Sequence, residues 1–279
     1  MRKHKEIWLL VGTVFTIWLI LTLIDNKRIE ITHYDINSNK IKNECTIVQI
    51  SDLHNTSYGK NNKILLDKIK EAKPDIITIT GDLIDSSKTN INIAMNFVNQ
   101  VVEIAPTYYV PGNHEAWAMS KYTTLKTKLN KAGVIVLETA SKEITINYNK
   151  INILGITDPD FTGEFGISNV DVVSTDLDTL NYDTDNFTIL LSHRPELFEA
   201  YKNRDIDLVL AGHAHGGQFR TAIGGGLIAP NQGLFPKYIS GLHASKKDEM
   251  QMIISRGLGN SVIPLRINNR PELVVIRIL

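Results

Sequence analysis

The sequence predicts an α/β protein with two β-sheets whose outer faces are covered by helices, preceded by one apolar N-terminal segment. Two observations indicate this fold class. In the first half of the chain, short runs rich in Val, Ile, Leu and Tyr alternate with amphipathic segments, which is typical of βαβ units and a mainly parallel sheet. After Gly133, further strand-like runs are joined by polar turns, so a second sheet is expected.

The individual elements follow from these patterns. Buried strands are predicted from their short, β-branched runs that stop at Gly, Pro, Asp or His, at Thr46–Ser51, Asp75–Thr80, Thr107–Pro111, Phe187–Ser192 and Asp207–Ala211. Helices are predicted from apolar residues at helical spacing, over Asn62–Ala72, Ile91–Ile104 and Lys121–Ala132. The later strands are expected at Val134–Leu137, Glu143–Tyr148, Lys150–Gly155, Met252–Ser255 and Glu272–Ile278.

The amino-acid composition limits the classes of protein to which the chain can belong. The chain has 279 residues, with 30 Lys+Arg against 30 Asp+Glu, 43% hydrophobic and 22% charged residues, as in a globular protein. A net charge of zero provides no general field for nucleic acid, so no nucleic-acid partner is expected. The single cysteine, Cys45, excludes an internal disulfide and any multi-cysteine metal site.

The apolar segment Ile7–Ile24 runs for 18 residues without a charge. As a helix it would measure about 27 Å, close to the hydrocarbon thickness of a bilayer. Arg2, Lys3 and Lys5 precede it, and the positive-inside rule would keep that end in the cytoplasm. The alternative is a cleaved signal peptide, but the stretch is long for one and ends without a small-residue cleavage site.

We therefore favour a retained signal anchor over cleavage. Residues 1–27 are interpreted as a cytoplasmic basic end with a single transmembrane helix, and residues 28–279 as one domain outside the cytoplasm. No sequence feature splits residues 28–279 further, and none indicates an oligomeric state.

The most informative residues come directly after the five predicted core strands. Polar side chains just beyond the carboxyl ends of parallel strands converge on one crevice, where open α/β sheets bind their ligands. The five motifs are Asp52-Leu-His54, Gly81-Asp82, Gly112-Asn113-His114-Glu115, His193-Arg194 and Gly212-His213-Ala-His215.

The residue types in these motifs suit a divalent metal. In Asp52-x-His54 and His213-x-His215, side chains two apart on an extended segment would share a side, so one ion could take both. Asp82 offers two oxygens that can bridge ions, and Asn113 offers a neutral oxygen. Imidazole suits Zn and Fe, whereas carboxylate and carbonyl oxygens suit Mn. A mixed set without thiolate is typical of a catalytic rather than a structural site.

Each motif alone has an ordinary structural alternative. Asp52-x-His54 can be a turn, Asp82 a helix N-cap, and Gly112-Asn113 a tight turn. His193 can precede a helix that begins at Pro195. These alternatives would have to hold together at five successive strand ends, so we interpret the motifs as one site.

Together, the motifs from about residue 46 to 217 resemble the calcineurin-like metallophosphoesterase superfamily. Two later stretches, Gly233–Tyr238 and Ser255–Gly259, are similar to its membrane-anchored bacterial branch, typified by the YkuE and YaeI proteins. The resemblance implies a four-layer α/β/β/α sandwich behind an N-terminal transmembrane helix. It also implies two divalent metal ions (Mn, Zn or Fe) and catalysis by a metal-bridging hydroxide.

The resemblance assigns roles by motif position. One ion would be held by Asp52, His54 and His215, and the other by Asn113, His193 and His213. Asp82 would bridge both ions, and His114 would act catalytically beside the scissile phosphate.

The function implied is hydrolysis of a phosphoester or pyrophosphate bond, in a cell-envelope, nucleotide-sugar or lipid substrate. The alternatives are a broad-specificity phosphatase or nucleotidase, and a non-catalytic module that binds cell-wall polymer. Asp85 and Glu115 are candidates for orienting the ligands, and the alternative for both is a solvated position on the surface. Arg194 and Arg256 are interpreted as structural ion pairs rather than phosphate ligands, and Trp117 as a packed loop anchor.

Overall fold

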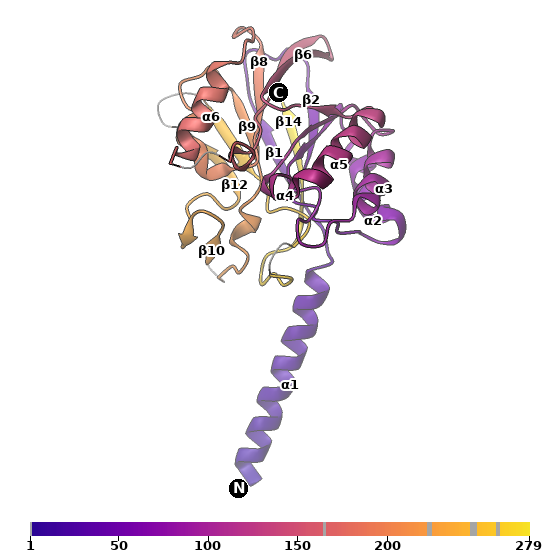
Figure 1. Ribbon diagram of the computed structural model, residues 1–279. Helices are drawn as coiled ribbons and strands as arrows, with labels where there is room; N and C mark the ends of the chain where they lie inside the picture. The colour runs from indigo at the N-terminus through magenta and orange to yellow at the C-terminus, as the bar shows by residue number, and fades with distance from the viewer. Residues whose placement is uncertain (1, 164–165, 222–224, 246–249, 261–262) are drawn as a thin grey trace.

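The computed structural model describes residues 2–163, 166–221, 225–245, 250–260 and 263–279. Of the predicted basic end, Met1 and the side chains of Arg2 and Lys3 lie outside these described residues. The described strands form two six-stranded sheets and one small hairpin (Figure 1). The first sheet has the order β1 (Glu30–Ile36), β14 (Glu272–Ile278), β2 (Cys45–Ile50), β3 (Ile76–Thr80), β4 (Thr107–Val110) and β5 (Ile135–Val136). The second has the order β12 (Gly241–Ala244), β13 (Gln251–Ile254), β9 (Leu208–Ala211), β8 (Phe187–Leu191), β7 (Asn149–Gly155) and β6 (Ala140–Ile146).

Both sheets are mainly parallel, although the sequence predicted this only for the sheet built from alternating strands and helices. Strands β2, β3, β4 and β5 are parallel neighbours, and so are β7, β8, β9 and β13. The antiparallel pairs are β14 with β2, β6 with β7 and β12 with β13. Strand β1 pairs in parallel with β14.

Alternating side chains of the strands divide the core into layers, because neighbouring residues of a strand face opposite sides of its sheet. In β2, Ile47 faces the second sheet while Val48 faces the helices. In β8, Ile189 faces the first sheet while Leu190 faces the opposite helices. The inter-sheet core thus lies between two helix–sheet cores, which confirms the four-layer α/β/β/α sandwich.

The helices occupy the two outer layers. The first sheet is covered by α2 (Lys63–Ala72), α3 (Ile91–Val101) and α5 (Met119–Lys131), and the second by α6 (Asn169–Asp178) and α7 (Phe198–Tyr201). A short helix, α4 (Asn113–Trp117), follows β4. Asn90 precedes helix α3 as its N-cap, and its side chain accepts hydrogen bonds from the backbone N–H groups of Asn92 and Ile93.

The apolar N-terminal segment forms α1 (Arg2–Asp25), which projects from one end of the sandwich (Figure 1). Among the described residues, it is the one helix long and apolar enough to cross a membrane, over His4–Asp25. Only 6% of its most apolar window is buried by the rest of the protein. The predicted helical segment is therefore present, extended by a turn at its start.

Several elements were not predicted from the sequence: β1, β12, the hairpin β10 (Ile228–Ala229) and β11 (Gly233–Leu234), and the helices α4, α6 and α7. Strands β1 and β12 lie at sheet edges. The exposed side chains of β1 are polar, and β12 is only four residues long with no buried residue, so neither has a buried apolar run. Helix α6 has few apolar residues and starts at an N-cap, Ser168, that the spacing of apolar residues does not reveal.

The strand directions place one end of the first sheet beside α1. Strand β1 leaves α1 after a short connection and runs parallel to β14, which is antiparallel to β2. The carboxyl end of β2, and those of its parallel neighbours β3 and β4, therefore lie at the end of the sheet from which α1 projects.

Candidate metal centre

The loops that follow β2 and β3 run side by side beyond the end of the sheet. The backbone N–H of Asp52 donates to Gly81 O at 3.1 Å, and that of His54 to Asp82 O at 3.0 Å. In the second sheet, the N–H of Gly212 donates to His193 O at 3.1 Å. The polar motifs are thus attached to continuations of their strands, and those of both sheets meet at one place.

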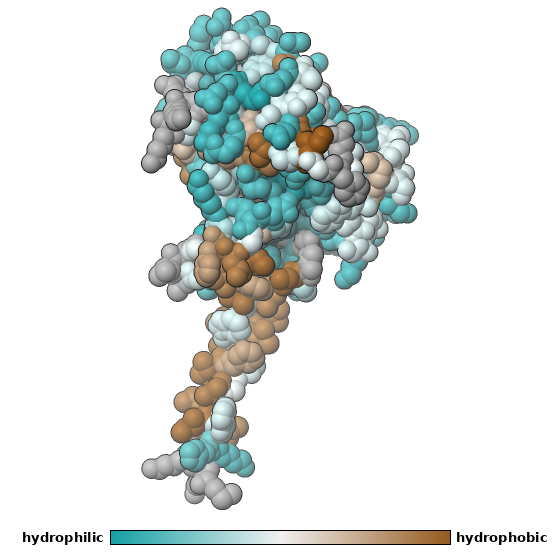
Figure 2. Space-filling model, turned by 60° about the vertical axis from the view of Figure 1, so that its left-hand side comes forward, coloured by the Kyte–Doolittle hydropathy of each residue, from teal (hydrophilic) through white to brown (hydrophobic). Residues whose placement is uncertain are grey.

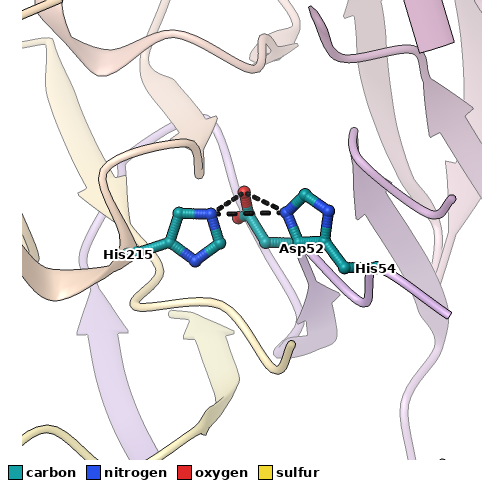
Figure 3. A group of neighbouring side chains, drawn as sticks. All are labelled: Asp52, His54 and His215. Carbon is teal, nitrogen blue, oxygen red and sulfur yellow. Dashed lines mark hydrogen bonds and ion pairs between the residues drawn. The ribbon is translucent and has the colours of Figure 1, made fainter. Parts of the chain in front are cut away.

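Asp52, His54 and His215 form a first buried group of potential ligands (Figure 3). His215 Nε2 lies 3.3 Å from His54 Nε2 and 3.5 Å from Asp52 Oδ1. His54 Nε2 lies 3.9 Å from Asp52 Oδ1. Two imidazoles and one carboxylate therefore point their acceptor atoms at a common point.

A second buried group consists of Asp82, His193 and His213. His193 Nε2 lies 3.2 Å from Asp82 Oδ2 and 3.2 Å from His213 Nδ1. Asn113 Oδ1 adds an oxygen 3.1 Å from His193 Nε2. Asp82 Oδ2 is also 3.5 Å from His54 Nε2, so Asp82 reaches both groups.

His114 lies beside the two groups. Its backbone N–H donates to Asp82 Oδ1 at 2.9 Å, and its ring lies 4.5 Å from that of His54, centroid to centroid. The backbone N–H of Ser86 donates to His114 Nδ1 at 3.0 Å. Because Nδ1 accepts this bond, neutral His114 carries its proton on Nε2.

Two carboxylates hold this arrangement from outside. Glu115 accepts backbone N–H bonds from Asp82 at 2.9 Å, Ile84 at 3.0 Å and Gly112 at 2.8 Å, so it ties the loops after β3 and β4 together. Asp85 Oδ2 lies 3.8 Å from His54 Nδ1. The interpretation of Glu115 and Asp85 as orienting residues agrees with these contacts.

The backbone conformation corrects the geometric reasoning from the sequence. Asp52, His54, His213 and His215 all have positive φ, between 45° and 64°, so neither D-x-H nor H-x-H is extended. Instead, tight left-handed turns direct the side chains. His213 and His215 consequently join different groups, and one ion cannot be assigned to both on the strength of their spacing.

Glycines before the potential ligands allow the loops to approach closely. A Cβ at Gly112 would lie 2.3 Å from Asp82 Oδ1, and one at Gly212 would lie 2.4 Å from Asp52 Oδ2. Both distances are far below van der Waals contact. Any side chain at these positions would displace a carboxylate of the site.

Several supporting residues were missed by the sequence reasoning. The backbone N–H of Leu258 donates to Ser51 O at 3.0 Å, and a Cβ at Gly257 would lie 2.7 Å from Asp52 Cβ. The Ser255–Gly259 stretch thus packs under Asp52, which explains a motif that had no chemical interpretation. Arg266 Nη2 lies 3.3 Å from His215 Nδ1. No sequence pattern marks Arg266 as a residue of the site, because it lies in none of the motifs that follow the predicted strands.

Burial sets the protonation of three imidazoles. It lowers the pKa of His54 to about 4, and it lowers the pKa values of His213 and His215 well below the usual range. At neutral pH these rings are therefore uncharged, and each presents a nitrogen lone pair.

The remaining imidazole behaves differently. Burial alone would lower the pKa of His193, but the carboxylates of Asp82 and Asp52 raise it to about 10. The pKa of Asp82 is well below its usual range because His193 outweighs the effect of burial, whereas burial and Asp82 raise the pKa of Asp52 to about 6. Without metal, a proton on His193 thus partly balances the two carboxylates.

The residues fit a pair of divalent cations. Within the described residues, the groups of potential ligands have donor atoms within 4.8 Å of one another, and all of their members are buried. Nitrogen and oxygen donors without thiolate suit Mn, Zn or Fe. Burying carboxylates and neutral imidazoles face to face is costly unless a cation compensates them.

The structure also shows where the three remaining candidate residues from the sequence analysis lie. The guanidinium of Arg194 is buried and contacts Asp158 at 2.7 and 2.8 Å, and that of Arg256 contacts Glu272 at 3.0 Å. Both arginines are confirmed as structural ion pairs. The expectation for Trp117 is confirmed only in part: its indole N–H donates to Asp160 Oδ2 at 2.9 Å and so anchors it to another loop, but the side chain is 60% exposed and lies beside His114.

A cavity of about 280 Å³ opens onto the site. One wall carries potential ligands and His114. The lining also contains the apolar side chains of Trp117, Ile228, Ala229, Pro230 and Ile263. A phosphate group at the polar wall would thus leave the rest of a substrate against apolar side chains.

Comparison with known proteins places this geometry in a family. The sequence profile of the calcineurin-like phosphoesterases matches residues 45–217. The metallophosphoesterase YkuE of Bacillus subtilis (strain 168) is 28% identical over 268 residues, covering 90% of this chain and 86% of YkuE. The phosphodiesterase YaeI of Escherichia coli (strain K12) is 28% identical over 239 residues, covering 84% of this chain and 82% of YaeI. The solved structure of TT1561 from Thermus thermophilus is 14% identical with a TM-score of 0.48, covering 77% of this chain and 91% of that chain.

The profile spans more than half of the 279 residues and contains all residues of the two ligand groups. The resemblance to the superfamily and to YkuE and YaeI is therefore confirmed. This chain belongs to the calcineurin-like phosphoesterase family and is a hydrolase that acts on phosphoesters.

Proposed function

We propose that the chain is a dinuclear metallophosphoesterase in which Asp52, His54 and His215 hold one ion. Asn113, His193 and His213 hold the other. The observation that carries the proposal is the position of Asp82, whose Oδ2 lies 3.5 Å from His54 Nε2 and 3.2 Å from His193 Nε2. A carboxylate shared by two groups is what a paired-ion site requires.

The bound ions would supply Lewis acidity that activates water and neutralises charge on the phosphate oxygens. The chain itself supplies orientation. His193 Nδ1 is 2.8 Å from Thr80 O, so it donates its proton there and turns the Nε2 lone pair toward Asn113 and Asp82. Neutral His193 is thus held in one tautomer.

His114 is proposed as the catalytic residue that handles the proton of the leaving group. The bond from Ser86 N–H keeps the proton of neutral His114 on Nε2. Such a group can donate to a leaving alkoxide, which is worth about 10²–10⁴-fold in rate for general acids.

The substrate is proposed to be a phosphoester or pyrophosphate of the cell envelope, in a nucleotide-sugar or lipid compound. The apolar lining residues Ile228, Pro230 and Ile263 support the lipid form of such a substrate, because an apolar portion would lie against them.

We also propose that residues 1–27 anchor the chain in the cell membrane and that residues 28–279 form an extracytoplasmic phosphoesterase domain. Tyr148 is 93% exposed, and Cys45 is buried. A Tyr148→Cys variant should therefore react with a membrane-impermeant maleimide in intact spheroplasts. Labelling only after lysis would place the domain in the cytoplasm and contradict this topology.

The catalytic proposal is tested with the full chain in detergent, after removal of metals and reconstitution with Mn²⁺, Zn²⁺ or Fe²⁺. Hydrolysis of bis(p-nitrophenyl) phosphate and p-nitrophenyl phosphate should require metal and should stop in the Asp82→Ala variant. Turnover that persists without metal would refute the proposed centre. An absence of turnover on any phosphoester would favour the binding module instead.

A further inference from the structure

Large apolar side chains are exposed on the loops around the cavity mouth. Phe235 is 78% exposed and Leu234 is 71% exposed at the β10–β11 hairpin, while Ile228 and Ile263 on the cavity wall are 42% and 39% exposed. Figure 2 shows hydrophobic surface gathered at the end of the domain where the apolar helix joins it. Contiguous exposed apolar surface of this kind marks a binding surface.

The helix α1 is fixed to this same end of the domain. Asn26 Nδ2 donates to Arg266 O at 2.8 Å, and the N–H of Arg266 donates to Asn26 Oδ1 at 2.8 Å. Asp25 pairs with Arg270 at 2.8 Å, and Thr22 is buried. The last turn of α1 is therefore held against residues 266–270, which lie next to Ile263 in the chain.

The strand directions put the catalytic site at that end as well. The carboxyl ends of β2, β3 and β4 lie at the α1 end of their sheet, and the cavity there is lined by residues of the hairpin and of the Ile263 segment. In Figure 1 the β10 hairpin lies at the end of the domain from which α1 leaves.

We infer that Leu234, Phe235 and Ile263 dock on the bilayer that α1 spans, so that the cavity mouth opens onto the membrane surface and takes a phosphoester carried by a membrane lipid. This inference rests on the proposed anchoring and hydrolysis. We assign a bilayer as the occupant because the apolar surface lies next to the end of an apolar helix. The attachment of that helix to the domain keeps the surface at the level where the helix would enter the membrane. Exposed cations, Lys27, Arg28 and Lys237, flank the surface and suit lipid phosphates.

Docking on the bilayer is tested by measuring how deeply a spin label on the surface lies in the membrane. The full chain is reconstituted in vesicles of phosphatidylethanolamine and phosphatidylglycerol, with a nitroxide attached at Phe235→Cys or, as a control, at Tyr148→Cys. Burial raises the pKa of the Cys45 thiol to about 12, so labelling is confined to the introduced cysteine. Tyr148 lies before β7, at the end of the second sheet opposite the site.

The label at position 235 should be more accessible to oxygen than to a water-soluble nickel complex, and the label at 148 should show the reverse. A label at 235 that is as water-accessible as the one at 148 overturns the inference. Low accessibility to both reagents overturns it as well, since that result indicates a protein partner or a second copy on the surface.

If the surface docks on the bilayer, the enzyme should prefer a phosphoester that lies in the membrane. Two chromogenic diesters with the same leaving group test this preference: hexadecyl p-nitrophenyl phosphate in the vesicles and ethyl p-nitrophenyl phosphate in solution. In the L234D/F235D variant the ratio of hexadecyl to ethyl turnover should fall by roughly tenfold or more, because charged side chains at the interface oppose docking. The Tyr148→Asp control should keep the parent ratio. An unchanged ratio in L234D/F235D overturns the inference. If the parent hydrolyses neither ester, the proposed function fails, while the depth measurement still decides whether the surface docks.

Discussion

Asp82 Oδ2, beyond the end of β3, lies 3.2 Å from Nε2 of His193, beyond the end of β8. This contact joins the two sheets at the site. Asp82 also contacts the other ligand group, because its Oδ2 is 3.5 Å from His54 Nε2.

The Asp82→Ala variant should therefore lose metal more severely than a variant of any other single carboxylate. We expect fewer than one ion per chain, since each ion loses a shared charged ligand. Metal content by mass spectrometry of the purified full chain measures this, with Asp35→Ala, an exposed partner of Arg277, as the control. Retention of two ions would show that Asp82 does not bridge.

Metal binding should release protons. The pKa of His193 is raised to about 10 by Asp82 and Asp52 in the metal-free protein, so below that pH the ring carries a second proton. A histidine must be neutral to bind a metal, so binding near pH 7.5 should release about one proton from this residue. Calorimetry in buffers with different ionisation enthalpies measures the number. Release that is unchanged in His193→Ala would contradict this assignment.

The His114→Ala variant should keep its ions but lose activity. The expected loss is about 10²–10⁴-fold for an alkyl ester, and smaller for a p-nitrophenyl ester whose leaving group needs no proton. Turnover of both esters, measured together with metal content, separates the two effects. Loss of metal would indicate instead that His114 is a ligand, as its place in the group with His54 and Asp82 allows.

The Gly112→Ala variant tests the close approach of the loops. Gly112 has φ −103°, a conformation open to alanine, so the effect is steric: the added Cβ would lie 2.3 Å from Asp82 Oδ1. We expect weaker metal binding and a loss of about 1–3 kcal/mol in stability, as for overpacked sites. Denaturant unfolding and metal titration measure these changes. The exposed Gly225→Ala, whose Cβ meets its nearest atom at 3.9 Å, should behave as the parent.

Local sequence patterns were sufficient to predict the layers of the fold and the residues that come together at the site. Buried strands are recognisable from short apolar runs, and each polar motif is adjacent in sequence to the strand that positions it. The apolar stretch Ile7–Ile24 likewise predicts α1 by composition alone. Such features depend on neighbours along the chain, so they can be recognised without knowing the fold.

Long-range packing decided the rest. Strand β14 is inserted between β1 and β2, and Arg266 contacts His215, so both features join residues distant in sequence. The turns with positive φ at Asp52, His54, His213 and His215 also have no signal in the local pattern. The same holds for the attachment of Asn26 to Arg266, which brings the helix and the cavity mouth to one end of the domain. No periodicity encodes such contacts, because they arise only when the two sheets close over a common core.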